Sequence, residues 1–220
     1  MRLRDKNQYK PSLPPLPVTA SPSKAEFRKQ LRACRTSLTR AEQLHAADAL
    51  ARRLLATRVV RISRRIACYF PNDGEIDPRP LIERLWMFKK DCYLPVLSHT
   101  PHEHLWFARV TPDTPFTPNR FGIPEPRISA DWRRARELDL ILLPLVGFDL
   151  AGNRLGMGAG FYDRCLEYLR LRRVWRKPRI VGLAHECQRV AQLPVSDWDI
   201  ALDAVVTDRA VYTMAGGIGA

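Results

Sequence analysis

A glycine-rich segment at residues 152–164 carries the residue types best suited to chemistry. Its sequence is Gly-Asn-Arg-Leu-Gly-Met-Gly-Ala-Gly-Phe-Tyr-Asp-Arg, and it follows an apolar run that ends at Val146. Glycine adopts left-handed backbone angles without strain and has no Cβ to hold a ligand away. We therefore expect the glycines at 156, 158 and 160 to turn successive backbone N–H groups toward one point. Such a group of donors binds anions, above all phosphate, and a helix N-terminus behind it adds to the attraction.

Two charged side chains flank these glycines. Arg154 presents a planar fork of donors to phosphate or carboxylate. Asp163 is a hard oxygen ligand of the kind that Mg²⁺ prefers. The segment thus predicts a phosphate site with a metal ligand beside it, although glycine spacing alone leaves open a flexible turn that binds nothing.

The spacing excludes two familiar phosphate-binding loops. A Walker loop ends in Gly-Lys-Ser or Gly-Lys-Thr, and this segment contains no lysine. A dinucleotide-binding fingerprint requires its third glycine at position 161, where Phe161 stands. The predicted site therefore belongs to neither class.

Strands and helices alternate around the segment. Buried strands are predicted by short apolar runs, at residues 66–70, 94–97, 105–110, 139–146, 179–184 and 204–208. Capping boxes at Ser23–Glu26 and Thr39–Glu42 predict two helices, Pro78 begins a third, and an amphipathic run from Cys165 to Arg173 predicts a fourth. We expect an α/β fold, a single domain with three layers (α/β/α) around a mostly parallel central sheet.

Composition suggests where this domain begins and ends. A chain of 220 residues is long enough to bury one sizeable core. Residues 1–22 carry five prolines and no periodicity, so we expect a disordered, basic extension there. The domain is predicted at 23–212, and the glycine-rich residues 213–220 are predicted to form a flexible tail.

Nothing in the sequence predicts a membrane or an oxidising compartment. The longest apolar run, from Leu138 to Leu150, is too short and too polar to span a bilayer, and no apolar signal segment is visible. The five cysteines form no Cys-x-x-Cys pattern. We expect a reduced, cytoplasmic protein without a membrane partner.

The net charge of +13 is unevenly distributed. Residues 1–65 hold 16 Lys/Arg against 4 Asp/Glu, whereas residues 66–220 hold 20 against 19. Three explanations remain open: a nucleic-acid partner, an anionic small molecule such as ATP or a polyglutamate chain, or a solvated basic face. Lys24 and Arg28 lie four residues apart on the first predicted helix, and spacing alone favours an ordinary exposed pair.

Three further segments hold candidate site residues. Glu75 lies just beyond the carboxyl end of a predicted strand, where open α/β sheets bind ligands; taken alone, it would more often be a solvated loop acid. Residues 119–126 form a rigid, extended segment suited either to lining a pocket or to a structural crossover. His102 and His104 could face one side of a strand as metal ligands, and a polar hairpin tip explains them better.

Together these segments resemble the 5-formyltetrahydrofolate cyclo-ligase family, also called 5,10-methenyltetrahydrofolate synthetase. The resemblance runs from about residue 23 to about residue 210. The pattern Arg154-Leu155-Gly156-x-Gly158-x-Gly160-x-Tyr162-Asp163 is its most specific part. The rest is carried by Lys24-x-x-x-Arg28, Pro71 to Pro80, Asn119 to Pro126, Val181 to Ala184, and Asp197-Trp198-Asp199.

The resemblance implies a reaction. The family closes 5-formyltetrahydrofolate to 5,10-methenyltetrahydrofolate with ATP and Mg²⁺ and releases ADP and phosphate. A formyl oxygen is a poor leaving group, and the family phosphorylates it before a neighbouring folate nitrogen attacks the activated carbon. Positioning and charge stabilisation do most of the work in such a transfer.

The resemblance also assigns roles to single residues. It implies ATP contacts from Lys24, Arg28, Arg154, Leu155, Gly156, Met157, Gly158, Ala159, Gly160, Phe161 and Tyr162. It implies magnesium ligation by Asp163 and Asp199, and folate contacts from Phe70, Glu75 and Phe121. Arg154 and Tyr162 are the implied catalytic residues, and Lys24 and Arg28 change from an exposed pair to phosphate ligands. Ala159 departs from a common glycine and Phe161 from a frequent tyrosine.

On this interpretation the partner is a small molecule, 5-formyltetrahydrofolate with or without a polyglutamate chain. A monomer without a nucleic-acid partner is expected. Two other classes compete: a basic nucleic-acid-binding protein that uses residues 1–65, and a sugar-phosphate isomerase or acyl-CoA transferase on a similar sheet. Dependence on ATP distinguishes the cyclo-ligase from both.

Overall fold

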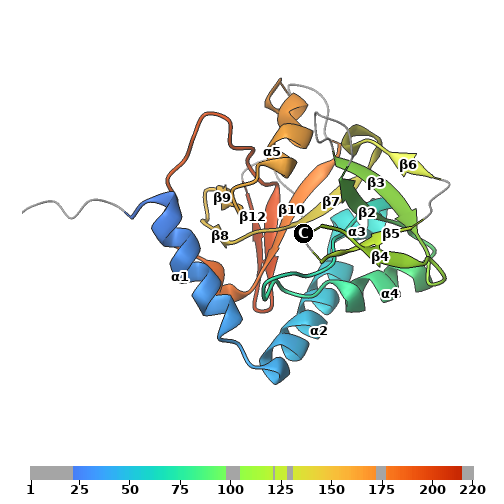
Figure 1. Cartoon of the computed structure of the whole chain (residues 1–220), viewed down its shortest axis with the longest axis horizontal. Coiled ribbons are helices and arrows are strands. Elements are labelled where there is room, and N and C mark those ends of the chain that lie inside the picture. Colours follow the sequence, from blue (N-terminus) through green and yellow to red (C-terminus); the bar gives the residue numbers. More distant parts are fainter. Residues whose placement is uncertain (1–21, 98–104, 121, 128–130, 172–176, 215–220) are drawn as a thin grey trace, which may run out of the picture.

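A computed structural model describes residues 22–97, 105–120, 122–127, 131–171 and 177–214 (Figure 1). Most of the predicted extension and tail lies outside these ranges. Phe121, His102 and His104 lie outside them as well.

An eight-stranded sheet forms the centre, in the order β12-β11-β10-β7-β1-β2-β3-β6. The five inner strands are parallel: β1 (Arg65–Ala67), β2 (Asp91–Leu97), β7 (Leu140–Pro144), β10 (Arg179–Ala184) and β11 (Ala204–Thr207). Antiparallel strands flank them: β3 (Leu105–Val110) and β6 (Trp132–Arg133) on one side, β12 (Val211–Thr213) on the other. The predicted α/β fold with a mostly parallel sheet is confirmed.

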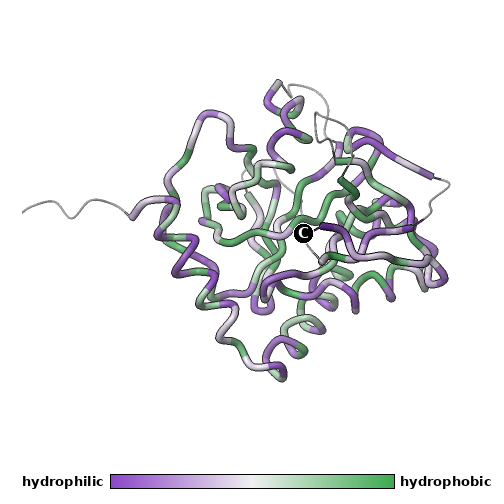
Figure 2. The backbone as a smooth tube through the Cα atoms, viewed as in Figure 1, coloured by the Kyte–Doolittle hydropathy of each residue, from purple (hydrophilic) through white to green (hydrophobic). Residues whose placement is uncertain are grey.

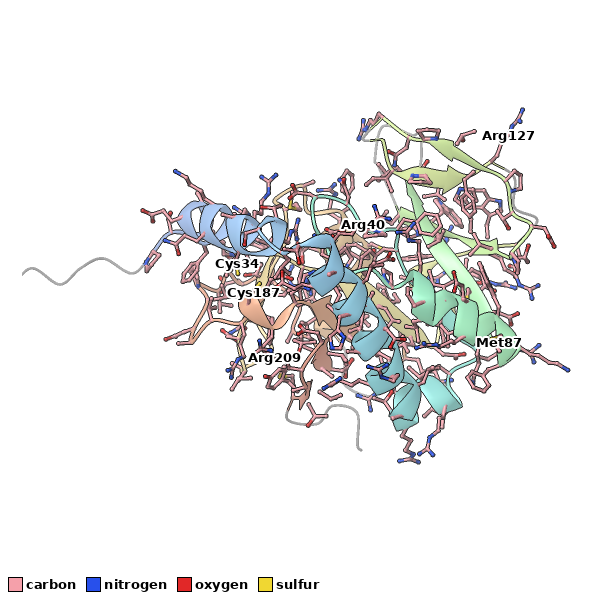
Figure 3. The ribbon with its side chains drawn as sticks, turned by 90° about the horizontal axis from the view of Figure 1, so that it is seen from below. Cys34, Arg40, Met87, Arg127, Cys187 and Arg209 are labelled. Atoms are coloured by element: carbon pink, nitrogen blue, oxygen red, sulfur yellow. The ribbon has the colours of Figure 1, made fainter. Side chains whose placement is uncertain are left out.

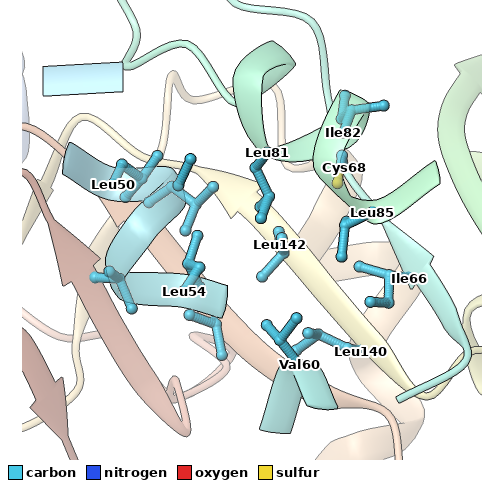
Figure 4. Close-up of a cluster of buried hydrophobic side chains, with 14 of the residues drawn as sticks. Leu50, Leu54, Val60, Ile66, Cys68, Leu81, Ile82, Leu85, Leu140 and Leu142 are labelled. Atoms are coloured by element: carbon cyan, nitrogen blue, oxygen red, sulfur yellow. The ribbon is translucent and has the colours of Figure 1, made fainter. Parts of the chain in front are cut away.

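Side chains that alternate along the inner strands supply two separate cores. Leu140 and Leu142 pack against the helices on one face. These helices are α2 (Arg40–Ala56), α3 (Arg58–Ile62) and α4 (Arg79–Met87). Ile141 and Leu143 point to the other face, because successive strand residues face opposite sides. The buried side chains of the first core meet in Figure 4, and Figure 2 shows hydrophobic residues along the central strands and hydrophilic ones on the outer helices.

The second face has a thinner cover. It consists of α5 (Phe161–Leu166), the 3₁₀ turns η1 (Ala135–Glu137) and η2 (Glu167–Leu171), and the hairpin of β8 (Gly147–Phe148) with β9 (Arg154–Leu155). The predicted helix at 165–173 is therefore wrong in its bounds. Gly160, with φ 68°, takes the left-handed conformation and caps α5, so the helix begins directly after the loop.

Helix α1 (Lys24–Thr36) lies across one end of the sheet against η3 (Glu186–Gln188) and β8 (Figure 1). Cys34 Sγ lies 3.7 Å from the Cys187 carbonyl oxygen, and the two residues are neighbours in Figure 3. Both predicted capping boxes are present, with Glu26 accepting from the Ser23 N–H at 2.7 Å and Glu42 from the Thr39 N–H at 2.8 Å. The start of α1 is thus fixed by local sequence.

Among the described helices, none is long and apolar enough to cross a bilayer. The remaining elements, β4 (Phe116–Pro118) and β5 (Pro124–Pro126), pair as an antiparallel hairpin. Its β5 strand contacts β2, so the hairpin stands at the carboxyl end of that strand.

Leu142→Ala tests the central role of β7. Leu142 is fully buried, so we expect its truncation to lower the free energy of unfolding by about 2–5 kcal/mol. Leu44→Ala, on the 60% exposed Leu44 of α2, is the matched control and should change it by less than about 0.5 kcal/mol. Urea titration of both variants measures the difference, and equal losses would contradict the assigned core.

Candidate active site

A cavity of about 790 Å³ opens where the inner parallel strands end. It is lined by Tyr69 and Phe70 beyond β1, Leu97 at the end of β2, and Pro144 at the end of β7. This is the edge at which open α/β sheets bind ligands. Every predicted site residue within the described ranges lines this cavity: Lys24, Arg28, Phe70, Glu75, the ten residues from Arg154 to Asp163, and Asp199.

The glycine loop supplies backbone donors to this cavity. Gly158 and Gly160 have φ of 104° and 68°, as predicted, whereas Gly156 does not adopt a positive φ. Across the described ranges, the N–H groups of residues 157–160 meet no protein acceptor. They are therefore available to a ligand, and an anion would satisfy several of them at once.

Two cations of α1 reach the loop and the segment opposite it. Arg28 Nε donates to the Gly156 carbonyl at 2.8 Å. Lys24 Nζ donates to Asp199 Oδ2 and to Ser196 Oγ, both at 2.8 Å. Lys24 and Arg28 are one helical turn apart, so they place two positive charges along one side of the cavity.

Arg154 is buried and contacts one predicted metal ligand, Asp163, and the residue that follows the other, Ile200. Its guanidinium donates to Asp163 Oδ1 and to the Ile200 carbonyl. Burial lowers the pKa of Arg154, and the nearby carboxylates of Asp163 and Asp199 oppose that shift. The Arg154 guanidinium thus contacts Asp163 and the residue after Asp199. Two carboxylates that bind one metal ion must lie near each other, and this arrangement meets that condition.

Arg35 joins the parts of the site and was not among the predicted site residues. Its side chain is fully buried and donates to the Asp73 carboxylate at 2.8 Å, the Asp73 carbonyl at 2.8 Å and the Leu145 carbonyl at 3.2 Å. The signal was present in the sequence. Lys24, Arg28, Arg32 and Arg35 follow one another at helical spacing, which puts four cations on one face of α1.

Glu75 lies in the cavity wall within reach of this network. Its carboxylate accepts from the Asn72 N–H at 3.1 Å and lies 4.0 Å from Arg35 Nη1. Burial raises the pKa of Glu75 to about 7, and the charge of Arg35 only partly opposes this. Burial, together with the Glu75 carboxylate, also raises the pKa of Tyr162, so its phenol stays neutral.

Another wall is aromatic and apolar. Phe70 packs edge-on against Phe116 with ring centroids 5.1 Å apart. Residues 119–126 line the cavity, as one of the two interpretations predicted, through Asn119, Ile123, Pro124 and Glu125. Phe121 was the only residue of this predicted segment with an assigned role; Asn119 and Glu125 had none, and the Asn119 side-chain amide donates to the Glu125 carboxylate at 3.0 Å. Their six-residue separation across a turn was the sequence pattern that could have indicated this contact.

The donor set suits a metal that the substrate helps to bind. Within the described ranges, no cluster of three or more His, Cys, Asp or Glu could hold a metal by itself. Mg²⁺ usually takes one or two carboxylates plus substrate phosphates. Asp163 and Asp199 both line the cavity, and Arg154 contacts Asp163 and the residue after Asp199, so the two carboxylates fit that requirement.

Fold and cavity together define a class of protein: an α/β protein with a cavity at the carboxyl ends of its parallel strands, lined by a glycine loop on one side and an aromatic wall on another. Comparison with known proteins identifies the family. The sequence profile of the 5-formyltetrahydrofolate cyclo-ligase family matches residues 20–208. This chain belongs to that family, which makes it a ligase of folate metabolism.

Relatives of known name align with most of this chain. The 5-formyltetrahydrofolate cyclo-ligase of Haemophilus influenzae is 42% identical over 180 residues, covering 80% of this chain and 93% of its own. The Escherichia coli cyclo-ligase is 40% identical over 185 residues, covering 83% and 98%. The solved structure of Aquifex aeolicus 5,10-methenyltetrahydrofolate synthetase is 31% identical, with a TM-score of 0.74, covering 90% of this chain and 95% of its own.

Gly158→Ala should destabilise the protein, because alanine at φ 104° is strained. We expect a loss of about 1–2 kcal/mol in the free energy of unfolding. Gly156→Ala is the matched control. Its backbone needs no positive φ and an added Cβ would meet no atom within 4 Å, so its stability should be unchanged or slightly higher. Urea titration that ranks Gly156→Ala as the less stable variant would contradict the loop geometry.

Glu75→Gln should change how stability depends on pH. Because the folded protein raises the pKa of Glu75 from 4.5 to about 7, protonated Glu75 stabilises the fold below about pH 4.5, and this contribution is lost as the pH rises through 7. Between pH 5 and pH 8 the wild type should lose up to about 3 kcal/mol relative to Glu75→Gln. Urea titrations of both proteins at these pH values measure it; parallel pH curves would contradict the shift.

Proposed function

We propose that this chain catalyses the ATP- and Mg²⁺-dependent cyclisation of 5-formyltetrahydrofolate to 5,10-methenyltetrahydrofolate, with release of ADP and phosphate. One cavity holds two kinds of surface, and this observation carries the proposal. The first, called the anion cradle here, consists of the N–H groups of residues 157–160 with Lys24 and Arg28. The second is the aromatic and carboxylate wall of Phe70 and Glu75. A reaction that joins a nucleotide's terminal phosphate to a folate needs both.

The triphosphate would occupy the cradle. The N–H groups of residues 157–160 would donate to phosphate oxygens, and Lys24 and Arg28 would neutralise their charge. Of the three explanations for the basic N-terminal third, this favours an anionic small molecule. Arg32 and Arg35 are engaged with Asp73, and Lys24 and Arg28 line the cavity instead of forming an outward basic face.

The folate would bind along the other wall. The pyrimidine ring of the reduced pterin and the benzoyl ring that follows the pterin are flat and apolar on their faces, which suits Phe70 and Ile123 of the cavity lining. The carboxylate of Glu75 would accept hydrogen bonds from the amide and amino groups at the pterin edge. Phe121, predicted to contact the same ligand, stays a prediction because it lies outside the described residues.

The proposed chemistry has two steps, a phosphoryl transfer and a ring closure. The formyl oxygen attacks the γ-phosphorus of ATP, the bond from that phosphorus to the bridging oxygen breaks, and ADP leaves. The neighbouring folate nitrogen then attacks the formyl carbon and gives up its proton to solvent, the carbon–oxygen bond breaks, and phosphate departs with the former formyl oxygen. Charge that develops on the transferred group is met by fixed donors, which need no rearrangement during the reaction.

Arg154 and Tyr162 are the proposed catalytic residues. Arg154, buried and held by Asp163 and the Ile200 carbonyl, would keep its positive charge next to the γ-phosphate. Tyr162 is neutral, because burial raises its pKa, so its O–H can donate to the formyl oxygen and orient it. Asp163 and Asp199 would hold Mg²⁺, which supplies charge neutralisation between the phosphates.

The proposed setting is the cytoplasm. All five cysteines are free thiols, which supports a reducing compartment. A monomer remains the expectation for the oligomeric state.

The absorbance of methenyltetrahydrofolate tests the proposed function directly. Purified protein with 5-formyltetrahydrofolate, ATP and Mg²⁺ should produce the absorbance, and omission of ATP should abolish it. In the same assay Asp163→Asn should reduce kcat by at least about a hundredfold, because it removes a metal-binding charge and the partner of Arg154.

Asp91→Asn is the matched control for this variant. Asp91 also pairs with arginines, Arg64 and Arg109, and it begins β2 at the opposite edge of the sheet. It should retain near-normal turnover. Product formation without ATP would refute the proposed function, and equal rates in the two aspartate variants would refute the assigned role of Asp163.

A further inference from the structure

Trp198 is an exposed indole on the rim of the cavity. Its side chain lines the cavity, yet the residue is 62% exposed. Among large apolar side chains of the described cavity lining, only Met157 is also exposed, at 47%. A rigid, flat ring left in water beside a binding site offers a stacking surface that no protein group uses.

The backbone that carries Trp198 is fixed from both sides. The Ser196 N–H donates to Asp199 Oδ2 at 2.8 Å, and the Asp199 N–H donates to the Ser196 carbonyl at 3.0 Å. Lys24 Nζ then joins both side chains to α1 at 2.8 Å. The ring therefore stands on a closed four-residue turn instead of a loose loop, which lowers the entropy cost of stacking a ligand on it.

A continuous row of contacts connects this turn to the glycine loop. Asp199, next to Trp198, is bound by Lys24; Arg28, one turn further along α1, is bound to Gly156 of the loop. A ligand with phosphates on the loop and a chain of groups running along Lys24 would bring its far end to the indole. A nucleoside triphosphate has that form, with a flat base at the end opposite the γ-phosphate.

We propose that Trp198 is the base-stacking residue of the nucleotide subsite, with its indole face against the adenine ring. The inference rests on the proposed function and adds to it a residue that contributes affinity for the base of the nucleotide. Stacking on an aromatic face tolerates every base. Within the described ranges, the groups beside the turn on the cavity side are Lys24, Arg28 and the backbone of the glycine loop, which suit the phosphates and do not read the edge of the base. GTP should therefore bind within a few-fold of ATP.

The folate rings are the competing occupant, and the contacts argue against them. Phe70, Glu75 and Ile123 supply the aromatic and carboxylate wall, through the segments after β1 and between β4 and β5. Trp198 belongs instead to the segment whose Asp199 forms an ion pair with Lys24, one of the two cations of the anion cradle. The side chain therefore serves the nucleotide.

Calorimetry on the full chain, with Mg²⁺ present, separates the base from the phosphates. Three proteins are titrated with ATP and with inorganic tripolyphosphate, which lacks a base: wild type, Trp198→Leu and Trp198→Phe. Trp198→Leu should bind ATP about tenfold more weakly, the usual consequence of losing one base–aromatic stack. Its affinity for tripolyphosphate should equal that of the wild type, and Trp198→Phe should bind ATP within about threefold of the wild type.

Trp132→Leu provides the matched control. Trp132 is also exposed, at 42%, and lies on the edge strand β6 outside the cavity, so its loss should leave both affinities unchanged. In steady-state assays Trp198→Leu should raise KM for ATP about tenfold without changing KM for 5-formyltetrahydrofolate.

Three results would overturn the inference: unchanged ATP affinity in Trp198→Leu, an equal loss for ATP and tripolyphosphate, or a rise in KM for the folate instead of ATP. The wild-type titrations distinguish this from failure of the proposed function. If the wild type binds ATP and Trp198→Leu binds it equally well, only the role of Trp198 falls. If the wild type binds neither ligand, the proposed function falls and takes this inference with it.

Discussion

The geometry of the site depends on the buried guanidinium of Arg35. Arg35 is fully buried in α1 and bonds to Asp73 in the turn that holds Glu75 and to Leu145 just beyond β7. Removing one partner of a buried ion pair typically costs about 3–5 kcal/mol, because the remaining charge cannot reach water. Arg35 thus fixes α1 against the carboxyl edge of the sheet. Arg28 and Lys24, two and three turns earlier on the same helix, take their positions from it.

The charges of the site are paired before any ligand arrives. Asp163 is held by Arg154 and Asp199 by Lys24, so the two acids that suit a metal each satisfy a cation of the cradle. A metal–phosphate ligand brings both signs and can exchange with both pairs at once, whereas a metal or a phosphate alone would leave one charge unpaired. The arrangement would favour binding of the two together, as the proposed transfer from ATP requires.

Features that depend on residues close in sequence were predictable, and they include much of the architecture and most of the candidate site. Features that depend on contacts between distant residues were not. The capping boxes of α1 and α2 and the apolar runs of β7 and β10 depend on neighbours in sequence, so they were predictable. The burial of Arg35 was not, because its partners lie 38 and 110 residues away. Gly156 shows the limit of spacing arguments: it repeats the glycine pattern without the backbone angle, which the tertiary course of the loop decides.

The central claim is that main-chain N–H groups of the glycine loop, held next to the cations of α1, bind the phosphates of ATP. Nuclear magnetic resonance of ¹⁵N-labelled protein observes those N–H groups directly during a titration with ATP and Mg²⁺. The account predicts large, saturable shifts for the amides of residues 157–160, and none for buried core amides such as that of Leu54 in α2. Saturation of the protein with ATP while the loop amides stay unchanged would contradict it.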